Sequence, residues 1–217
     1  MKLAIIGASG FVGSQLLKEA ILRKHEVTAV VRKPERIAEK NPSLKVIALD
    51  VLDTEALSVV LKGQDMVISA YNPGWGNPDI YSDFLKGSAS IQEAVKKSGV
   101  KRFLVIGGAG SLEVSSGLQL IDTPQFPAEW KNGALGARDY LTVLKKEQDM
   151  EWTYFSPAIL MHHGIDSGRT GQYRLGLDSP VRDENGVSKL SVEDLAIVIL
   201  DEVEKKQFVR KRFTAAY

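Results

Sequence analysis

Three glycines near the start of the chain are spaced like those of an anion-binding turn. They lie at intervals of three residues between an apolar run, Lys2 to Ile6, and a segment with helical periodicity. Glycine permits a tight turn and close backbone approach to a ligand, and the helix start that follows offers free N–H groups to a phosphate. This context predicts a dinucleotide site, although a glycine-rich connection that binds nothing is the alternative. The residues expected at the pyrophosphate are Gly7, Ser9, Gly10, Phe11, Val12 and Gly13.

A basic pair, Arg32 and Lys33, follows the second apolar run, Val27 to Val31. Sites that prefer NAD usually carry Asp or Glu here, to accept hydrogen bonds from the ribose hydroxyls. A guanidinium at this place can instead form a forked contact with a 2′-phosphate. We therefore expect NADP(H) to be preferred over NAD(H). A solvated basic residue at a strand end is the alternative interpretation of Arg32.

The ends of three further apolar runs supply the remaining cofactor candidates. In open α/β sheets, ligands bind at the carboxyl ends of the strands. Asp50 is a candidate adenine contact, and a surface turn residue is its alternative role. The residues expected at these three strand ends are Asp50, Val51, Ser69, Ala70, Tyr71, Gly107 and Gly108.

Short apolar runs alternate with helical patterns along the chain, which predicts a parallel sheet with right-handed crossovers. The fold class is therefore α/β, a Rossmann-like doubly wound parallel sheet with helices on both faces. We expect a single domain over 1–217, with substrate loops at about 72–80, 108–136 and 158–187. The other expected strands are Val46–Leu49, Met66–Ala70, Phe103–Ile106 and Trp152–Phe155, and the later helices are Ala56–Leu61, Tyr81–Ser98, Ala137–Glu147 and one from Ser191 to about Val203.

The composition argues against several classes of protein. The 217 residues carry a formal net charge of +1, which does not suggest a nucleic-acid partner. No cysteine is present, so a disulfide framework, a thiolate zinc site and a cysteine nucleophile are excluded, and we expect no metal. No apolar run is long enough to span a bilayer, and the first strand leaves no room for a signal peptide. We expect a cytoplasmic protein with a small-molecule substrate, as a monomer or a homodimer.

Several motifs resemble one family over nearly the whole chain. The turn from Gly7 to Gly13 resembles the cofactor turn of atypical and extended short-chain dehydrogenase/reductases. The later motifs resemble the NAD(P)H-binding subgroup near biliverdin IXβ reductase/flavin reductase and NmrA-like proteins, which includes bacterial proteins labelled NAD-dependent epimerase or dehydratase. These motifs are Gly107-Gly108-Ala109-Gly110-Ser111, Phe155-Ser156-Pro157-Ala158, Thr170-Gly171-Gln172-Tyr173-Arg174 and Ser191-Val192-Glu193-Asp194. The resemblance implies an adenine contact at Asp50 and a ribose near Ser69 to Asn72.

The acid/base pair of many short-chain dehydrogenases, Tyr-x-x-x-Lys, is absent. Tyr140 is followed four residues later by Leu144, and Lys145 lies about 140° further round the helix. The two side chains cannot share a helix face, so Tyr140 is either catalytic without its usual partner or a packing residue.

Other candidates follow the fifth and sixth strands. Ser111 could orient a substrate or satisfy the backbone of its loop, and His163 could donate a proton at neutral pH. Exposed aromatic side chains would suit a flat acceptor by stacking, or would pin loops to the core. The residues expected to line the substrate pocket are Asn72, Trp75, Trp130, Pro157, His162 and Tyr173.

These observations favour an NADP(H)-dependent oxidoreductase that reduces a small carbonyl, quinone or flavin-like acceptor by hydride transfer. The missing Tyr-x-x-x-Lys pair keeps open a non-catalytic, NADP(H)-sensing regulatory protein. An epimerase or dehydratase acting on a nucleotide sugar is a third alternative, although that chemistry needs an acid/base pair.

Overall fold

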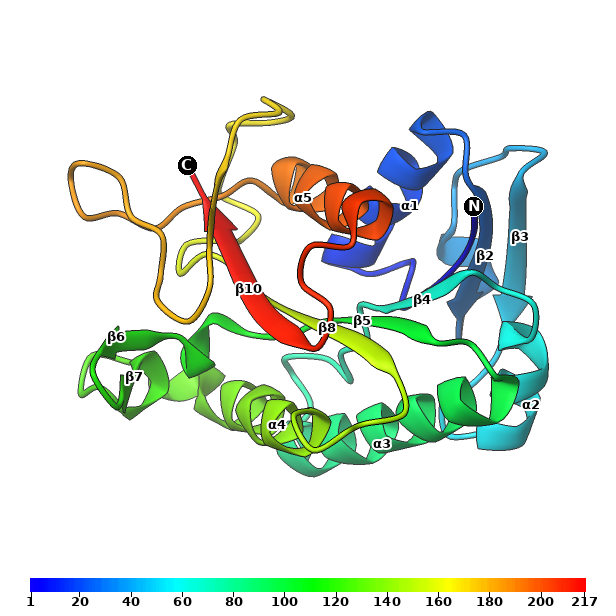
Figure 1. Cartoon of the computed structure of the whole chain (residues 1–217), viewed down its shortest axis with the longest axis horizontal. Helices are drawn as coiled ribbons and strands as arrows, with labels where there is room; N and C mark the ends of the chain where they lie inside the picture. The colour runs from blue at the N-terminus through cyan, green and yellow to red at the C-terminus, as the bar shows by residue number, and fades with distance from the viewer.

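A computed structural model describes all residues from 1 to 217, and an eight-stranded sheet runs through its centre (Figure 1). The strand order is β3-β2-β1-β4-β5-β8-β10-β9, and every neighbouring pair is parallel except β10 with β9. The strands are β1 (Lys2–Ile6), β2 (Glu26–Val31), β3 (Leu44–Ala48), β4 (Met66–Ser69), β5 (Arg102–Ile106), β8 (Glu151–Ser156), β9 (Arg174–Gly176) and β10 (Lys211–Ala216). This is the expected Rossmann-like doubly wound sheet.

Two layers of helices cover the sheet (Figure 1). The α1 and α5 helices pack together on one face, while α2, α3 and α4 form a row on the other. A β6–β7 hairpin and three short 3₁₀ turns complete the chain. The bounds are α1 (Phe11–Leu22), α2 (Thr54–Leu61), α3 (Ile80–Ser98), α4 (Ala128–Leu144), α5 (Val192–Lys205), β6 (Glu113–Ser115), β7 (Leu118–Gln119), η1 (Pro34–Arg36), η2 (Ala109–Ser111) and η3 (Leu120–Asp122).

The sheet separates two hydrophobic cores. Side chains of α1 and α5 pack with one face of the strands, in a cluster that includes Leu16, Leu195 and Phe213. Side chains of α2, α3 and α4 pack with the other face, in a cluster that includes Phe84 and Tyr140. Strands β1, β4 and β5 are buried on both faces, which explains their unbroken apolar character.

The register of the central strands brings the expected cofactor residues to one edge. Ile6 of β1 pairs with Val30 of β2 and with Ser69 of β4. The residues that follow these three strands therefore meet at the carboxyl end of the sheet.

The structure differs from the sequence-based prediction in the second half of the chain. Helix α4 begins at Ala128 rather than Ala137, so much of the expected 108–136 loop is helix, hairpin and 3₁₀ turn. A Cβ on Gly133 would lie 2.6 Å from the Trp75 ring, so this glycine permits close packing rather than a turn. Strands β9 and β10 were not expected either. No helix is long and apolar enough to cross a membrane.

Candidate functional site

The turn between β1 and α1 accepts only glycine at two positions. Gly7 has a φ of 78°, and a Cβ there would lie 2.6 Å from the carbonyl oxygen of Ala70. A Cβ on Gly13 would lie 2.1 Å from the carbonyl oxygen of Gly7. The first and third glycines therefore bring the turn, the end of β4 and the helix into direct backbone contact.

The middle glycine leaves the start of α1 open. Gly10 is the N-cap of α1, and a Cβ there would meet only the Gly7 carbonyl oxygen, at 3.3 Å. No side chain caps this helix, and its first turn holds no acidic residue. The first turns of α2, α3, α4 and α5 each hold at least one acidic residue. The first-turn N–H groups of α1 therefore have no internal acceptor and form a cradle for an anion.

A cavity of about 410 Å³ opens over this turn. Its walls come from the turn, the first residues of α1, the loop after β8 and the start of α5. The ring of His163 lies 4.0 Å from the ring of Phe11, measured between centroids, and His162 stands beside it with Nδ1 accepting a hydrogen bond from the Gly164 amide. The lining residues are Ser9, Gly10, Phe11, Ser14, Gln15, His162, His163, Ile165, Val192 and Glu193.

Five of these lining residues were missed by the sequence analysis: Ser14, Gln15, Ile165, Val192 and Glu193. A helix was expected from Ser191, and in the structure Ser191 Oγ caps α5 by accepting a hydrogen bond from the Asp194 amide. Its role as a cavity wall depends on the packing of α5 beside α1, and no local pattern encodes that packing.

The basic pair follows β2 with both side chains exposed. Arg32 and Asp50 both lie close enough to Tyr71 to affect its ionisation. Burial is the main cause of the raised pKa of Tyr71. The negative charges of Asp83 and Asp50 raise this pKa further, whereas the positive charge of Arg32 lowers it. The Tyr71 hydroxyl donates to the carbonyl oxygen of Asp83 at 3.1 Å. A guanidinium, a carboxylate and an aromatic ring thus follow the neighbouring strands β2, β3 and β4.

The residues after β3 are held in a turn. Asp50 Oδ1 accepts a hydrogen bond from the Leu52 amide at 3.0 Å, while the side chain remains exposed. Val51 is buried, and its carbonyl oxygen accepts from Ser90 Oγ at 2.6 Å. The Asp50 carboxylate is therefore available to a ligand, and the buried Val51 anchors the turn through its hydrogen bond from Ser90.

Gly107 and Gly108 follow β5 at the same edge of the sheet. A Cβ on Gly107 would lie 1.9 Å from the ring of Tyr154, which is fully buried beneath it. The Tyr154 hydroxyl donates to the carbonyl oxygen of Ala137 at 2.8 Å and so links β8 to α4. Tyr154 supports this part of the site, although the sequence identified only the two glycines.

Two candidate catalytic residues lie inside the protein. Tyr140 is 1% exposed, and its hydroxyl donates to Gln92 Oε1 at 3.1 Å between α4 and α3. Burial raises the pKa of Tyr140 strongly, so it holds its proton. Ser111 is also 1% exposed; its carbonyl oxygen accepts from Arg212 and its hydroxyl faces Ser156 Oγ at 3.5 Å. Both side chains are therefore enclosed, Tyr140 between α4 and α3 and Ser111 within its loop.

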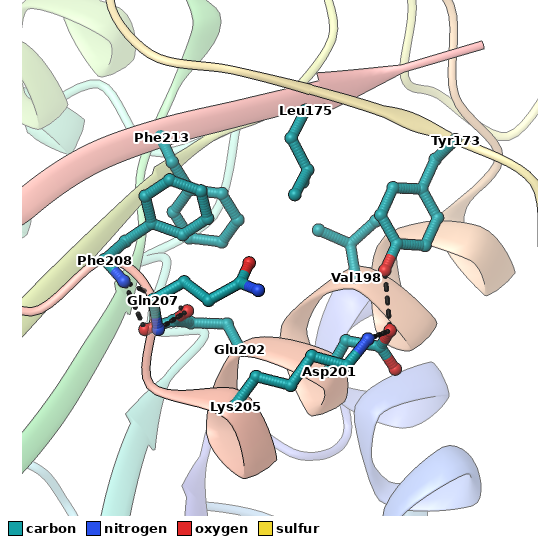
Figure 2. A pocket seen from close by; sticks show the side chains of 9 residues that line it. All are labelled: Tyr173, Leu175, Val198, Asp201, Glu202, Lys205, Gln207, Phe208 and Phe213. Atoms are coloured by element: carbon teal, nitrogen blue, oxygen red, sulfur yellow. Dashed lines mark hydrogen bonds and ion pairs between the residues drawn. The ribbon is translucent and has the colours of Figure 1, made fainter.

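Tyr173 lies away from the cofactor turn, contrary to its expected place in the pocket. It lines a separate cavity of about 100 Å³ near the far end of α5, with Leu175, Phe208 and Phe213 (Figure 2). Its hydroxyl donates to Asp201 Oδ2 at 2.7 Å. This hydrogen bond directs the Tyr173 ring toward α5. The family resemblance located Tyr173 in a sequence motif but did not indicate the direction of its side chain.

The other expected pocket residues are divided between surface and interior. Trp75 is 60% exposed and Trp130 48% exposed, and Trp75 contacts α4 at Gly133. Asn72 Oδ1 accepts from the Gly74 amide at 2.7 Å and shapes the loop before α3. Pro157 is buried directly after β8.

The sequence profile described as NAD(P)H-binding matches residues 7–206 of this chain. The chain belongs to the NAD(P)H-binding family. Among curated relatives of this NAD(P)H-binding protein, the "Uncharacterized protein YwnB" of Bacillus subtilis (strain 168) is 36% identical over 216 residues, which cover 99% of this chain and 97% of that protein.

Two solved structures extend the similarity. The "putative epimerase" of Bacteroides thetaiotaomicron is 46% identical with a TM-score of 0.92, over 100% of this chain and 96% of that one. The "putative NADH-flavin reductase" of Streptococcus pneumoniae TIGR4 is 35% identical with a TM-score of 0.87, over 100% and 99% of the two chains. The NAD(P)H-binding protein thus shares its full length with relatives of two different names.

The geometry of the turn fits a nicotinamide dinucleotide. The open first turn of α1 is suited to a pyrophosphate, because Gly10 lines the cavity and has no side chain to obstruct an anion there. Bound there, such a cofactor supplies a hydride donor or acceptor. The His162–His163 pair forms the opposite wall, where it can exclude water.

Proposed function

We propose that the protein is an NADPH-dependent reductase that transfers hydride to a small carbonyl, quinone or flavin-like acceptor. The observation that carries the NADP(H) preference is the exposed Arg32–Lys33 pair directly after β2. A carboxylate at this place would repel a 2′-phosphate, whereas a guanidinium can donate two hydrogen bonds to it.

The residues of the site divide the work of binding. The backbone from Ser9 to Gly13 holds the pyrophosphate, Arg32 binds the 2′-phosphate, and Asp50 accepts a hydrogen bond from the adenine amino group. The backbone of Gly107 and Gly108, directly after β5, borders the nicotinamide half. Ser69 and Ala70 form the floor between these two halves, beside Tyr71.

The acceptor class rests on the exposed aromatic side chains and on one relative. Trp75 and Trp130 lie on the α4 side of the site, where a flat molecule could stack against an indole. The relative named NADH-flavin reductase fits the same class of acceptor. His162 and His163 are the histidines of the cavity wall and the candidates for a proton donor.

Calorimetry with NADPH and NADH tests the cofactor preference. We expect the Kd for NADPH to be lower by more than about tenfold, which corresponds to about 1.4 kcal/mol. Arg32→Ala should abolish the difference. Arg36→Ala is the matched control, because Arg36 is also exposed and basic but lies in the η1 turn. Equal affinities in the unmodified protein would refute the preference.

Turnover is tested separately, by following NADPH oxidation with flavin, quinone and aldehyde panels. Steady oxidation with one class identifies the acceptor. Single substitutions His162→Gln and His163→Gln then show whether either imidazole contributes to kcat. Unchanged kcat in both variants would exclude a histidine proton donor.

A regulatory NADP(H) sensor is the second candidate function. The burial of Tyr140 and Ser111 favours it, because two of the four side chains considered for catalysis are then shielded from a ligand. Tight NADPH binding without turnover across all three panels would support the sensor and refute the reductase.

A further inference from the structure

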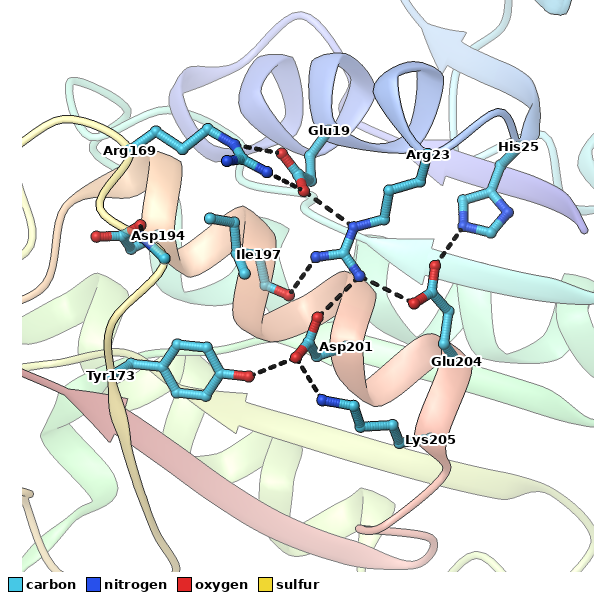
Figure 3. Close-up of polar contacts among 11 residues, drawn as sticks. Glu19, Arg23, His25, Arg169, Tyr173, Asp194, Ile197, Asp201, Glu204 and Lys205 are labelled. Carbon is cyan, nitrogen blue, oxygen red and sulfur yellow. Dashed lines mark hydrogen bonds and ion pairs between the residues drawn. The ribbon is translucent and has the colours of Figure 1, made fainter.

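The loop after β8 is tied to the outer surface of α1 and α5 (Figure 3). We call residues 168–173 the strap, because this segment makes hydrogen bonds to both helices. Three carboxylates hold it: Glu19 of α1, and Asp194 and Asp201 of α5. The strap follows directly after the His162–Ile165 segment that forms a wall of the cofactor cavity.

Asp194 is the most completely enclosed of these carboxylates. It is 0% exposed, and its four hydrogen bonds all come from neutral donors. Oδ1 accepts from the amides of Thr170 and Gly171 at 2.9 and 2.8 Å. Oδ2 accepts from Thr170 Oγ1 at 2.6 Å and from the Tyr217 hydroxyl at 2.7 Å. Three of the four bonds therefore go to the strap.

Neighbouring contacts hold the strap on either side of Asp194. Ser191 Oγ donates to the carbonyl oxygen of Gly168 at 2.6 Å. Arg169 forms a two-pronged contact with Glu19, with both N–O distances at 3.0 Å. Burial alone would raise the pKa of Glu19, but hydrogen bonds from Arg169 and Arg23 outweigh it and lower the pKa. Glu19 is therefore ionised when it binds the strap.

We propose that Asp194 is a positioning residue for cofactor binding, acting through the strap to hold His162 and His163 against the cofactor turn. This inference rests on the proposed function, because it requires a dinucleotide at that turn. Without the strap, the segment that carries His162 and His163 would lose its fixed place beside Phe11. Cofactor binding would then have to order this segment, at a cost in affinity.

The sheet order shows which half of the cofactor depends on the strap. Arg32 and Asp50 follow β2 and β3, on one side of β1. The loop with His162 and His163 follows β8, on the other side of β1. The adenosine half therefore binds away from the strap, and the pyrophosphate and nicotinamide half binds beneath the histidines.

The experiment compares NADPH with adenosine 2′,5′-bisphosphate, which carries only the adenosine half and its phosphates. In Asp194→Ala, we expect the Kd for NADPH to rise by at least about tenfold. The Kd for the bisphosphate should change by less than about twofold. Asp194→Asn should restore most of the NADPH affinity, because its amide oxygen still accepts from both strap amides. Tryptic cleavage at Arg169 should be faster in Asp194→Ala than in Asp194→Asn.

Glu202→Gln is the matched control. Glu202 is the other buried carboxylate of α5 that binds backbone amides, but it holds Gln207 and Phe208 rather than the strap. We expect it to lower thermal stability and leave both dissociation constants unchanged. If Asp194→Ala does not fold, the double variant Arg169→Ala/Thr170→Val removes two strap anchors from exposed positions instead.

The outcomes separate the inference from the function beneath it. Unchanged NADPH affinity in a strap variant, with normal binding by the unmodified protein, overturns the inference alone. An equal loss for NADPH and the bisphosphate does the same, because it assigns Asp194 to general folding. Failure of the unmodified protein to bind either ligand overturns the proposed function as well.

Discussion

Replacing Gly10 with alanine should separate cofactor binding from folding. The backbone at Gly10 has a φ of −82° and a ψ of 176°, which alanine adopts without strain. Its added methyl group would meet only one atom, the Gly7 carbonyl oxygen at 3.3 Å. Alanine also reduces the entropy of the unfolded chain, which contributes about 0.4–1 kcal/mol to stability. We therefore expect the free energy of unfolding to change by no more than about 1 kcal/mol.

Binding should respond much more strongly to the same methyl group. A phosphate oxygen must approach the first-turn amide nitrogens of α1 to about 2.9 Å, and the new methyl stands in that path. Losing one hydrogen bond to a charged group costs about 1.5–3 kcal/mol. The Kd for NADPH should therefore rise by between about tenfold and somewhat over a hundredfold.

Gly13→Ala is the matched comparison within the same turn. Its methyl group would lie 2.1 Å from the Gly7 carbonyl oxygen and 2.7 Å from the Gly7 carbonyl carbon. Backbone atoms cannot move aside as a side chain can, so the turn must open at a cost of about 1–3 kcal/mol. In a chain of this size, that loss lowers Tm by about 2–4 °C per kcal/mol.

Calorimetric titration with NADPH and thermal unfolding without ligand measure the two effects. Gly10→Ala should lose affinity while keeping its Tm, and Gly13→Ala should lose both. NADPH affinity in Gly10→Ala equal to that of the unmodified protein would refute the assignment of the anion to this turn.

Three further predictions concern other parts of the structure. Tyr140→Phe should leave NADPH oxidation unchanged and reduce stability to urea by about 0.5–1.5 kcal/mol, the value of one lost hydrogen bond; a large fall in kcat would contradict the packing role. Burial alone would raise the pKa of Asp201, but hydrogen bonds from Lys205, Tyr173 and Arg23 lower it from 3.8 to about 2. This carboxylate therefore stabilises the fold above about pH 4, by less than about 2 kcal/mol because solvent screens the partly exposed group, and that stability disappears as the pH falls toward 2. Asp201→Asn should flatten this part of the acid unfolding curve, and an unchanged curve would argue against the assignment. Gly133→Ala should displace the exposed Trp75 ring and alter acceptor preference at nearly constant NADPH affinity. Kinetics with the acceptor panel measure this preference, and an unchanged preference would show that the indole is remote from the substrate.

The sequence predicted those parts of the protein that depend on local structure. The turn from Gly7 to Gly13 was recognisable because its glycines, the strand before it and the helix after it are neighbours in the sequence. The parallel sheet with helices on both faces followed from the alternation of apolar runs with helical patterns, whereas the strand order became known only from the structure. The structure therefore places the expected cofactor residues at one edge of the sheet.

The features that were missed depend on contacts between distant segments. Strand β10 contains a single large apolar residue, Phe213, and its partners β8 and β9 lie far from it along the chain. Gly133 and Gly136 resemble a loop in the sequence, yet they let α4 lie close to Trp75 and Phe84. The direction of Tyr173 is set by Asp201, far along the chain.

The division of the interior by the sheet has a consequence for the evolution of new specificities. The dinucleotide cradle rests on the α1 and α5 layer, whereas the indoles beside α4 rest on the opposite layer. Substitutions in the α4 layer therefore alter a different hydrophobic cluster from the one that packs beneath the cradle. A scaffold with two separate cores is suited to diversification by random mutagenesis in one layer at a time.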